Sequence, residues 1–179
     1  MFKISEIYTT APEEFKTALQ EKTYEWLTKL GIEYERVDTD EAITMEDCVL
    51  INKALDMKMV KTLFLCNKKK TEFYIFVTTG SKHFNSKKFQ ELTGAKHLSF
   101  APEELFEEML GVKIGAATVF SSIIDTDNKI KIYIDYDVYT EEYYGCSDGT
   151  TTCYMKIKTK DIIEKFLPAV NHTAMVVQM

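Results

Sequence analysis

A single lysine interrupts an otherwise apolar run in the first half of the chain. Lys61 lies between Met59 and Leu65, and strand alternation would place it on the same face as Leu63 and Leu65. An inward-facing ammonium is costly unless an anion or an open cleft solvates it, so Lys61 is a candidate contact for an anionic ligand. The residues alone leave a second interpretation open, in which this charge guards a strand end against aggregation.

Two further segments combine small residues with polar side chains. Gly111–Thr118 contains two glycines and two alanines after an expected helix, which would let a ligand approach backbone amide groups closely. A tight helix-to-strand connection explains the same composition. Gly145–Thr152 gathers hydroxyl, thiol and carboxylate groups, but a nucleophile there would need a base, and none of the three histidines is near in sequence. We interpret this segment as a polar turn that enters a strand.

Neither the cysteines nor any catalytic motif identifies an enzyme class. Cys48, Cys66, Cys146 and Cys153 form no CxxC pair, and no histidine lies at ligand spacing from them. We therefore expect reduced thiols and no metal. Walker, Rossmann, zinc-protease and nucleophile-elbow patterns are also absent from the sequence. The residues alone indicate only an α+β domain.

The charge limits the kind of nucleic-acid contact that the chain can make. The formal net charge is −6 over 179 residues, which argues against indiscriminate nucleic-acid binding. Lysines crowd residues 68–96, so one face is either basic or simply solvated. No apolar run is long enough for a bilayer, and residues 1–6 lack the features of a secretory signal. Both observations predict a cytoplasmic protein with no membrane partner.

Apolar periodicity and capping residues predict one domain, residues 1–179, of the α+β class. Helices are expected at 12–30, after a capping box at 44–47, and at 86–92, 102–110 and 159–167. Strands are expected at 32–37, 59–66, 73–79, 117–124, 130–134, 152–157 and 174–177. Because hairpins are mixed with helices, we expect a mostly antiparallel, curved sheet.

Several segments, in chain order, resemble the family of YbaK and the prolyl-tRNA synthetase-associated editing domain, including its freestanding ProX or PrdX branch. Tyr24–Tyr34 resembles the first helix and strand of the family, Val60–Leu65 its lysine strand, and Gly94–Phe100 the segment before its next helix. Leu110–Phe120 is similar to the family's glycine motif, which ends in Thr/Ser-Pro-Phe. The lysine strand and the glycine motif, in this order and at this separation, form a specific combination.

The resemblance implies a YbaK-like fold, with a barrel-like mixed sheet surrounded by helices. It also implies a carboxylic ester hydrolase that removes a wrongly attached amino acid from the acceptor end of a tRNA. The expected substrate is alanine, or a related small amino acid, on tRNA(Pro), and prolyl-tRNA synthetase is an expected partner. The family uses no metal and no other cofactor.

The same resemblance assigns roles to individual residues. Lys61 would anchor the 3′-terminal nucleotide through its phosphate or ester oxygens, and backbone groups near Gly115 would frame the aminoacyl group and the attacking water. Phe120 and Ser147 would line a small pocket for the amino acid. The full expected set comprises Lys61 and Gly115 as catalytic residues, and Ala116, Ala117, Thr118, Phe120, Ser147, Asp148 and Thr151 as substrate-binding residues.

Two departures from the family pattern bear on function. The family usually has proline at the position of Val119, and a His-Pro pair at the position of Ser147 and Asp148, with asparagine at the position of Thr151. The missing histidine leaves one alternative open, a non-catalytic module that binds aminoacyl-tRNA on the same fold. The acidic net charge leaves another open, a domain that binds small molecules or proteins on this scaffold.

Overall fold

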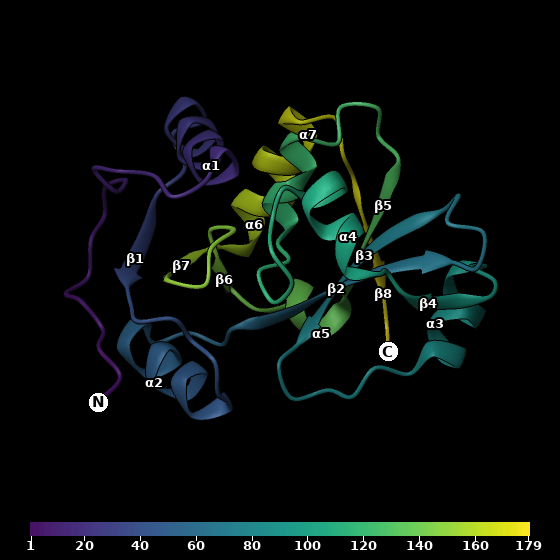
Figure 1. Cartoon of the computed structure of the whole chain (residues 1–179), viewed down its shortest axis with the longest axis horizontal. Coiled ribbons are helices and arrows are strands. Elements are labelled where there is room, and N and C mark those ends of the chain that lie inside the picture. Colours follow the sequence, from purple (N-terminus) through teal and green to yellow (C-terminus); the bar gives the residue numbers. More distant parts are fainter.

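The computed structural model describes residues 1–179 and contains two β-sheets with helices around them. Figure 1 shows α1 (Ala18–Lys29) and α2 (Met45–Leu55) on either side of β1 (Tyr34–Asp38) at one end of the molecule, and α3 (Ser86–Thr93) at the other end. None of the helices has the length and apolar character needed to span a membrane.

The larger sheet has five strands, which in sheet order are β4 (Leu98–Phe100), β2 (Val60–Asn67), β3 (Phe73–Thr79), β5 (Ile130–Asp135) and β8 (Ala174–Val177). The predicted hairpin is present: β2 and β3 are antiparallel, and Lys61 pairs with Thr78. β4 adds to β2 in the antiparallel sense, whereas β5 and β8 add in parallel. The sheet is therefore mixed.

The smaller sheet has three antiparallel strands, in the order β1, β7 (Cys153–Lys158) and β6 (Tyr143–Ser147). The two sheets meet where Met59, just before β2, forms an isolated parallel bridge with Gly145. A Cβ atom at Gly145 would lie 2.8 Å from the carbonyl oxygen of Lys58, so this close approach requires glycine. The expected α+β class is confirmed, but the sheets touch at one edge without closing into a barrel.

The helical segments after β4 are short. In chain order they are α4 (Glu103–Leu105), η1 (Phe106–Leu110), η2 (Val119–Ile123), α5 (Tyr136–Tyr139), α6 (Thr159–Asp161), η3 (Ile162–Phe166) and α7 (Leu167–Ala169). α4 continues directly into η1, a π-helical turn that ends at Gly111 with φ of +67°. The glycine predicted to stop this helix therefore does so, in a left-handed conformation.

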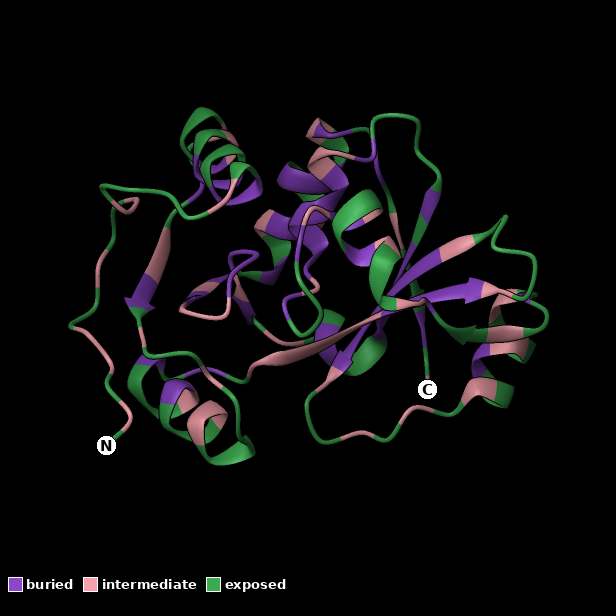
Figure 2. Ribbon diagram, in the orientation of Figure 1, coloured by how far each residue is buried: buried purple, intermediate pink, exposed green.

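The main hydrophobic core lies on one face of the five-stranded sheet, and a smaller core lies on the other face beneath α3. The faces alternate along β2: Phe64 belongs to the main core, and Leu65 to the smaller one. Figure 2 shows β3 and β5 largely buried, the first half of β2 half-buried, and exposed outer faces on α1 and α2. Because Lys61 shares its face with Leu65, its side chain leaves the strand on the α3 side.

A buried pair of ionisable side chains ties the segment before β8 to the turn before β5. The ring of His172, which is 3% exposed, places Nε2 2.8 Å from Oδ2 of Asp125 and Nδ1 2.6 Å from the carbonyl oxygen of Val170. Asp125 also accepts hydrogen bonds from the backbone N–H groups of Lys129 and Ile130. The Asp125 carboxylate is thus the hydrogen-bond partner of three groups: the two backbone N–H groups and the imidazole ring of His172.

Capping residues explain where the first two helices begin. The predicted capping box at 44–47 is confirmed, because Thr44 Oγ1 accepts from the backbone of Asp47 and Asp47 Oδ2 accepts from the backbone of Thr44. The first helix begins at Ala18 rather than at residue 12, because Thr17 caps it by accepting from the backbone of Gln20.

One expected strand is wrong. Residues 117–124 were expected to be extended, but Thr118 caps the 3₁₀ helix η2, in which Val119–Ser122 are all buried. An apolar run that is buried on every side has no periodicity with which to separate a strand from a short helix. The short elements β4, α5 and β6 were not predicted.

Candidate active site

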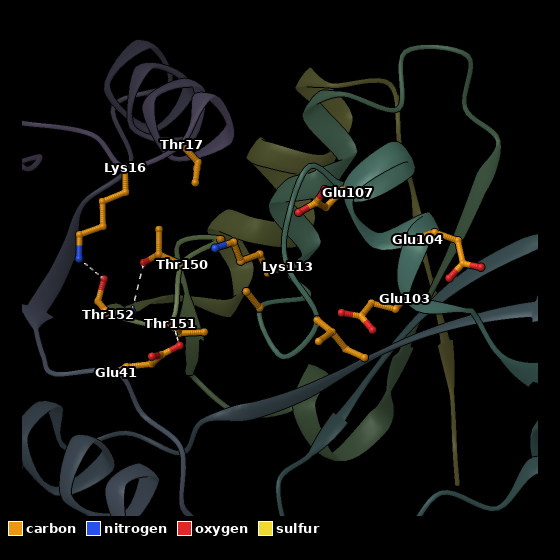
Figure 3. Close-up of a pocket in the computed structure, with 13 residues that line it drawn as sticks. Lys16, Thr17, Glu41, Glu103, Glu104, Glu107, Lys113, Thr150, Thr151 and Thr152 are labelled. Atoms are coloured by element: carbon orange, nitrogen blue, oxygen red, sulfur yellow. Dashed lines mark hydrogen bonds between the residues drawn. The ribbon is translucent and has the colours of Figure 1, made fainter.

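A cavity of about 860 Å³ opens between the start of α1, the loop that joins β6 to β7, and α4 (Figure 3). Such a volume suits a ligand the size of a nucleoside or a cofactor. Its lining is mostly polar and consists of Lys16, Thr17, Glu41, Glu103, Glu104, Glu107, Lys113, Ile114, Ala116, Gly149, Thr150, Thr151 and Thr152.

One wall of this cavity joins the start of α1 to the threonine-rich loop 149–152. Lys16 Nζ donates to Thr152 Oγ1 at 2.6 Å, and Thr151 Oγ1 donates to a carboxylate oxygen of Glu41 at 3.3 Å (Figure 3). We call Lys16, Thr17 and residues 149–152 the threonine wall. It presents hydroxyl groups and one ammonium to the cavity.

The opposite wall carries most of the charged side chains, namely Lys113 and the three glutamates Glu103, Glu104 and Glu107. Figure 3 shows Lys113 pointing across the cavity toward Thr150, while Glu103 and Glu107 project from α4 and η1 on the far side of the 112–116 loop. Lys113 and Lys16 make no ion pair. Both ammonium groups can therefore contact an anionic group of a ligand locally, although the four glutamates and two lysines of the lining give the cavity a net charge of −2.

The two small-residue segments singled out in the sequence lie against each other. Thr118 Oγ1 donates to the carbonyl oxygen of Ser147 at 3.5 Å. A Cβ atom at Gly149, where φ is +94°, would lie 3.6 Å from a methyl group of Val112. The fold therefore brings residues 111–118 and 145–152 together at one cavity. Considered alone, each segment could be an ordinary connection between two elements.

Only part of the expected residue set lines the cavity. Ala116 and Thr151 do so directly. Gly115 is the exposed residue before Ala116, and its φ of +91° is a backbone conformation that L side chains rarely adopt. Ala117 is half-buried, and Thr118 is buried as the cap of η2.

Three other expected residues lie behind the cavity rather than in its lining. Phe120 is fully buried and packs edge-on against Phe166, with ring centroids 5.1 Å apart. Ser147 is half-buried, and its Oγ accepts from the backbone of Gly149 at 3.4 Å. Asp148 is fully buried and contacts α1. The expectation that these side chains contact substrate remains a prediction.

The ammonium of Lys61 does not line the cavity either. The side chain is half-buried, and Nζ donates to the backbone carbonyl of Lys82 on the face that carries Leu65. The Lys82 ammonium in turn lies 2.9 Å from Asp135 and 2.7 Å from Asp137. Lys61 is therefore a half-buried cation whose hydrogen-bond partner is a carbonyl rather than a carboxylate, and its catalytic role remains a prediction.

The two thiols nearest the threonine wall are protonated. Burial raises the pKa of Cys146 and of Cys153, and the neighbouring carboxylate of Asp148 raises both further. Because the thiolate is the nucleophilic form, neither cysteine can serve as a ready nucleophile. Covalent catalysis by either of these cysteines is therefore disfavoured at this site.

Sequence reasoning missed both lysines and all four glutamates of the cavity lining. Lys16 meets Thr152 across 136 residues, a contact that no local pattern predicts. Lys113 did carry a usable signal, because it is a charge between Val112 and Ile114, the same kind of interruption that singled out Lys61.

Comparison with known proteins places this chain in a family. The model of the aminoacyl-tRNA editing domain matches residues 39–165, and the chain belongs to that family. It is 27% identical over 163 residues to the prolyl-tRNA synthetase associated domain-containing protein 1 of Danio rerio, covering 88% of this chain and 86% of that protein. It is 23% identical over 153 residues to the prolyl-tRNA editing protein ProX of Acetoanaerobium sticklandii, covering 86% and 93%.

A solved structure assigned as a candidate trans-editing enzyme for prolyl tRNA synthetase has the same fold. The two superpose with a TM-score of 0.64 at 17% identity, over 92% of this chain and 99% of the other. The family match begins at residue 39, so α1 and the lysine that precedes it lie outside the matched region.

Proposed function

We propose that the chain is a freestanding deacylase that hydrolyses mischarged tRNA, with alanine or a related small amino acid on tRNA(Pro) as its substrate. The observation that carries this proposal is the cavity that residues 111–118 and 145–152 build together in a member of the editing-domain family. A synthetase pocket made for proline rejects a smaller amino acid poorly, because missing methylene groups give only about 1–3 kcal/mol of discrimination. A second, hydrolytic site removes that error.

The proposed reaction places modest demands on the protein. The aminoacyl ester is already activated, so holding a water molecule, binding the developing oxyanion and orienting the terminal ribose hydroxyl are sufficient. Within Gly115–Thr118, the backbone amides of Gly115, Ala117 and Thr118 are the proposed oxyanion and water contacts, because the amide of Ala116 already donates to the carbonyl oxygen of Lys113 at 3.1 Å. Lys61 is the proposed anchor of the 3′-terminal nucleotide, and Lys16 and Lys113 add two ammonium groups that face the cavity.

The proposed partner is the acceptor end of tRNA(Pro), with prolyl-tRNA synthetase as the enzyme whose errors are corrected. A net charge of −6 supports contacts with the tRNA end rather than with a long stretch of backbone, because extensive phosphate binding requires a basic surface. Translation occurs in the cytosol, so we propose a cytosolic location.

The deciding experiment is a deacylation panel. Purified protein is incubated with Ala-tRNA(Pro), with tRNA(Pro) carrying other small amino acids, and with correctly charged Pro-tRNA(Pro), and ester loss is measured against a no-protein control. We expect accelerated loss of a small-amino-acid ester and little loss of Pro-tRNA(Pro). Tight binding without hydrolysis would instead support the non-catalytic module, and absence of binding at low salt would contradict both functions.

Ser147→His is expected to shift the preference of the enzyme toward alanine. The substitution restores the residue that the family usually has at this position, beside the loop that forms the threonine wall. We expect the kcat/KM ratio of alanine over the other amino acids to rise roughly tenfold, about the discrimination that one pocket contact provides. Ser147→Ala serves as the control for loss of the hydroxyl, and an unchanged ranking across the panel would show that residue 147 does not set specificity.

A further inference from the structure

Behind the threonine wall lies a carboxylate that the proposed reaction does not use. Asp148 is fully buried, and its Oδ2 accepts hydrogen bonds from Gln20 Nε2 and from the hydroxyl of Tyr24, both at 2.8 Å. Its Oδ1 accepts from Thr150 Oγ1 at 2.7 Å and from the backbone N–H of Thr150 at 3.2 Å. No lysine, arginine or histidine pairs with it. A buried carboxylate that relies only on neutral donors needs all of them in place.

The hydrogen bonds of Asp148 continue to the cavity surface on both sides. Gln20 accepts from the backbone N–H of Lys16 at 2.7 Å, and the Lys16 ammonium donates to Thr152 at 2.6 Å. Thr150 Oγ1, which donates to Asp148, also accepts from the backbone of Thr152 at 3.4 Å. Asp148 therefore connects the two parts of the threonine wall, the start of α1 and the loop 149–152.

Helix α1 supplies two of these donors and lies outside the region that matches the family model. A proline at position 148, which the family pattern usually has, can accept no side-chain hydrogen bond. The linkage therefore joins Asp148 and Thr150, inside the matched residues 39–165, to Gln20 and Tyr24, outside them.

We propose that Asp148 is a positioning residue that locks α1 to the loop 149–152 and so fixes the threonine wall that receives the 3′ end of the substrate. The inference rests on the proposed function for its substrate, whereas the linkage itself can be tested without one. Asp148 is fully buried and absent from the cavity lining, so in this proposal it acts through Thr150 and, by way of Gln20, through Lys16.

Asp148→Asn is the first test, because it keeps the shape of the side chain and removes one acceptor. The new amide can be turned either way. In one orientation its NH₂ group faces the donors of Gln20 and Tyr24, in the other it faces those of Thr150, and in both a hydrogen bond is lost because two donors meet. We expect a rise in KM for the mischarged tRNA and a fall of about 10- to 100-fold in kcat/KM, since a small displacement of a binding wall has effects of this size. Asp127→Asn, the same change at an exposed carboxylate outside the cavity, is the control and should leave both constants unchanged.

A charge exchange gives a sharper test. Gln20→Glu alone places a second carboxylate 2.8 Å from Asp148 and should impair the enzyme by repulsion. In the double variant Gln20→Glu with Asp148→Asn, the new amide NH₂ donates to the new carboxylate. The amide oxygen at position 148 still accepts from Thr150, and the carboxylate at position 20 still accepts from the backbone N–H of Lys16. We expect kcat/KM to return to within about threefold of the unsubstituted chain.

Hydrogen exchange separates this proposal from the proposed function. In Asp148→Asn we expect faster exchange of the amides of Thr150 and Thr152, restored in the double variant, at a temperature where all variants remain folded. Unchanged exchange in Asp148→Asn, or a double variant no better than the single ones, would overturn the positioning role. A chain that hydrolyses no mischarged tRNA, yet shows the exchange pattern, would refute the deacylase and leave the linkage standing.

Discussion

Lys61→Ala is expected to reduce deacylation roughly 100- to 1,000-fold while leaving the fold intact, as the loss of one preorganised charged contact to the 3′-terminal nucleotide does. The ammonium is half-buried, and its partner is the backbone carbonyl of Lys82, not a carboxylate. A phosphate oxygen is a better partner for an ammonium than a neutral carbonyl, because both groups are then charged. The position also lies two residues after Met59, where the two sheets meet.

The measurement is the single-turnover rate of ester loss, together with the urea midpoint of each variant. Lys61→Met keeps the apolar stem in place should the alanine variant be unstable. Lys58→Ala is the matched control, because Lys58 is an exposed lysine on the same segment that pairs with Glu141 at 2.9 Å. Its loss should leave the rate unchanged and should barely move the urea midpoint, because exposed ion pairs contribute little to stability. A folded Lys61 variant with full activity would remove this residue from the proposed mechanism.

Asp125→Ala is expected to lower the free energy of unfolding by about 3–5 kcal/mol, the usual cost of removing one partner of a buried pair. The substitution leaves the ring of His172 and the backbone N–H groups of Lys129 and Ile130 without their acceptor. All of these groups lie where the parallel strands β5 and β8 begin, so their loss should loosen that side of the five-stranded sheet.

Urea denaturation at neutral pH measures this effect directly. Asp127→Ala is the matched control, since Asp127 is exposed in the same turn and should change stability by less than about 0.5 kcal/mol. Equal midpoints for the two variants would mean that the buried pair contributes no more than an ordinary surface carboxylate.

Local chemistry in the sequence predicted local structure well. The capping box at Thr44, the hairpin of β2 and β3, and the helix stop at Gly111 each depend on residues within a few positions of one another. Non-local pairing was harder, because nothing in the sequence states that β1 pairs with β7 while β2 pairs with β3 and β4. The division into two sheets follows from those pairings.

The candidate site likewise has a part that the sequence predicts and a part that depends on long-range contacts. Residues 111–118 and 145–152 stand out by composition, and the fold joins them at one cavity. The contribution of α1 could not be predicted, because Gln20 and Tyr24 meet Asp148 across more than a hundred residues. Strand alternation predicted the face of the sheet on which the Lys61 side chain lies. Whether that face borders the cavity depends on how helices and loops pack around the whole sheet, which the sequence does not state.

The burial of the thiols has a practical consequence for labelling. Cys66, Cys146 and Cys153 are buried, whereas Cys48 on α2 is half-buried. Alkylating reagents attack thiolates that they can reach, so a maleimide dye should modify Cys48 well before the other three. The chain as it stands thus offers a single attachment point on α2, from which fluorescence can follow that helix when tRNA is added, with no engineered cysteine.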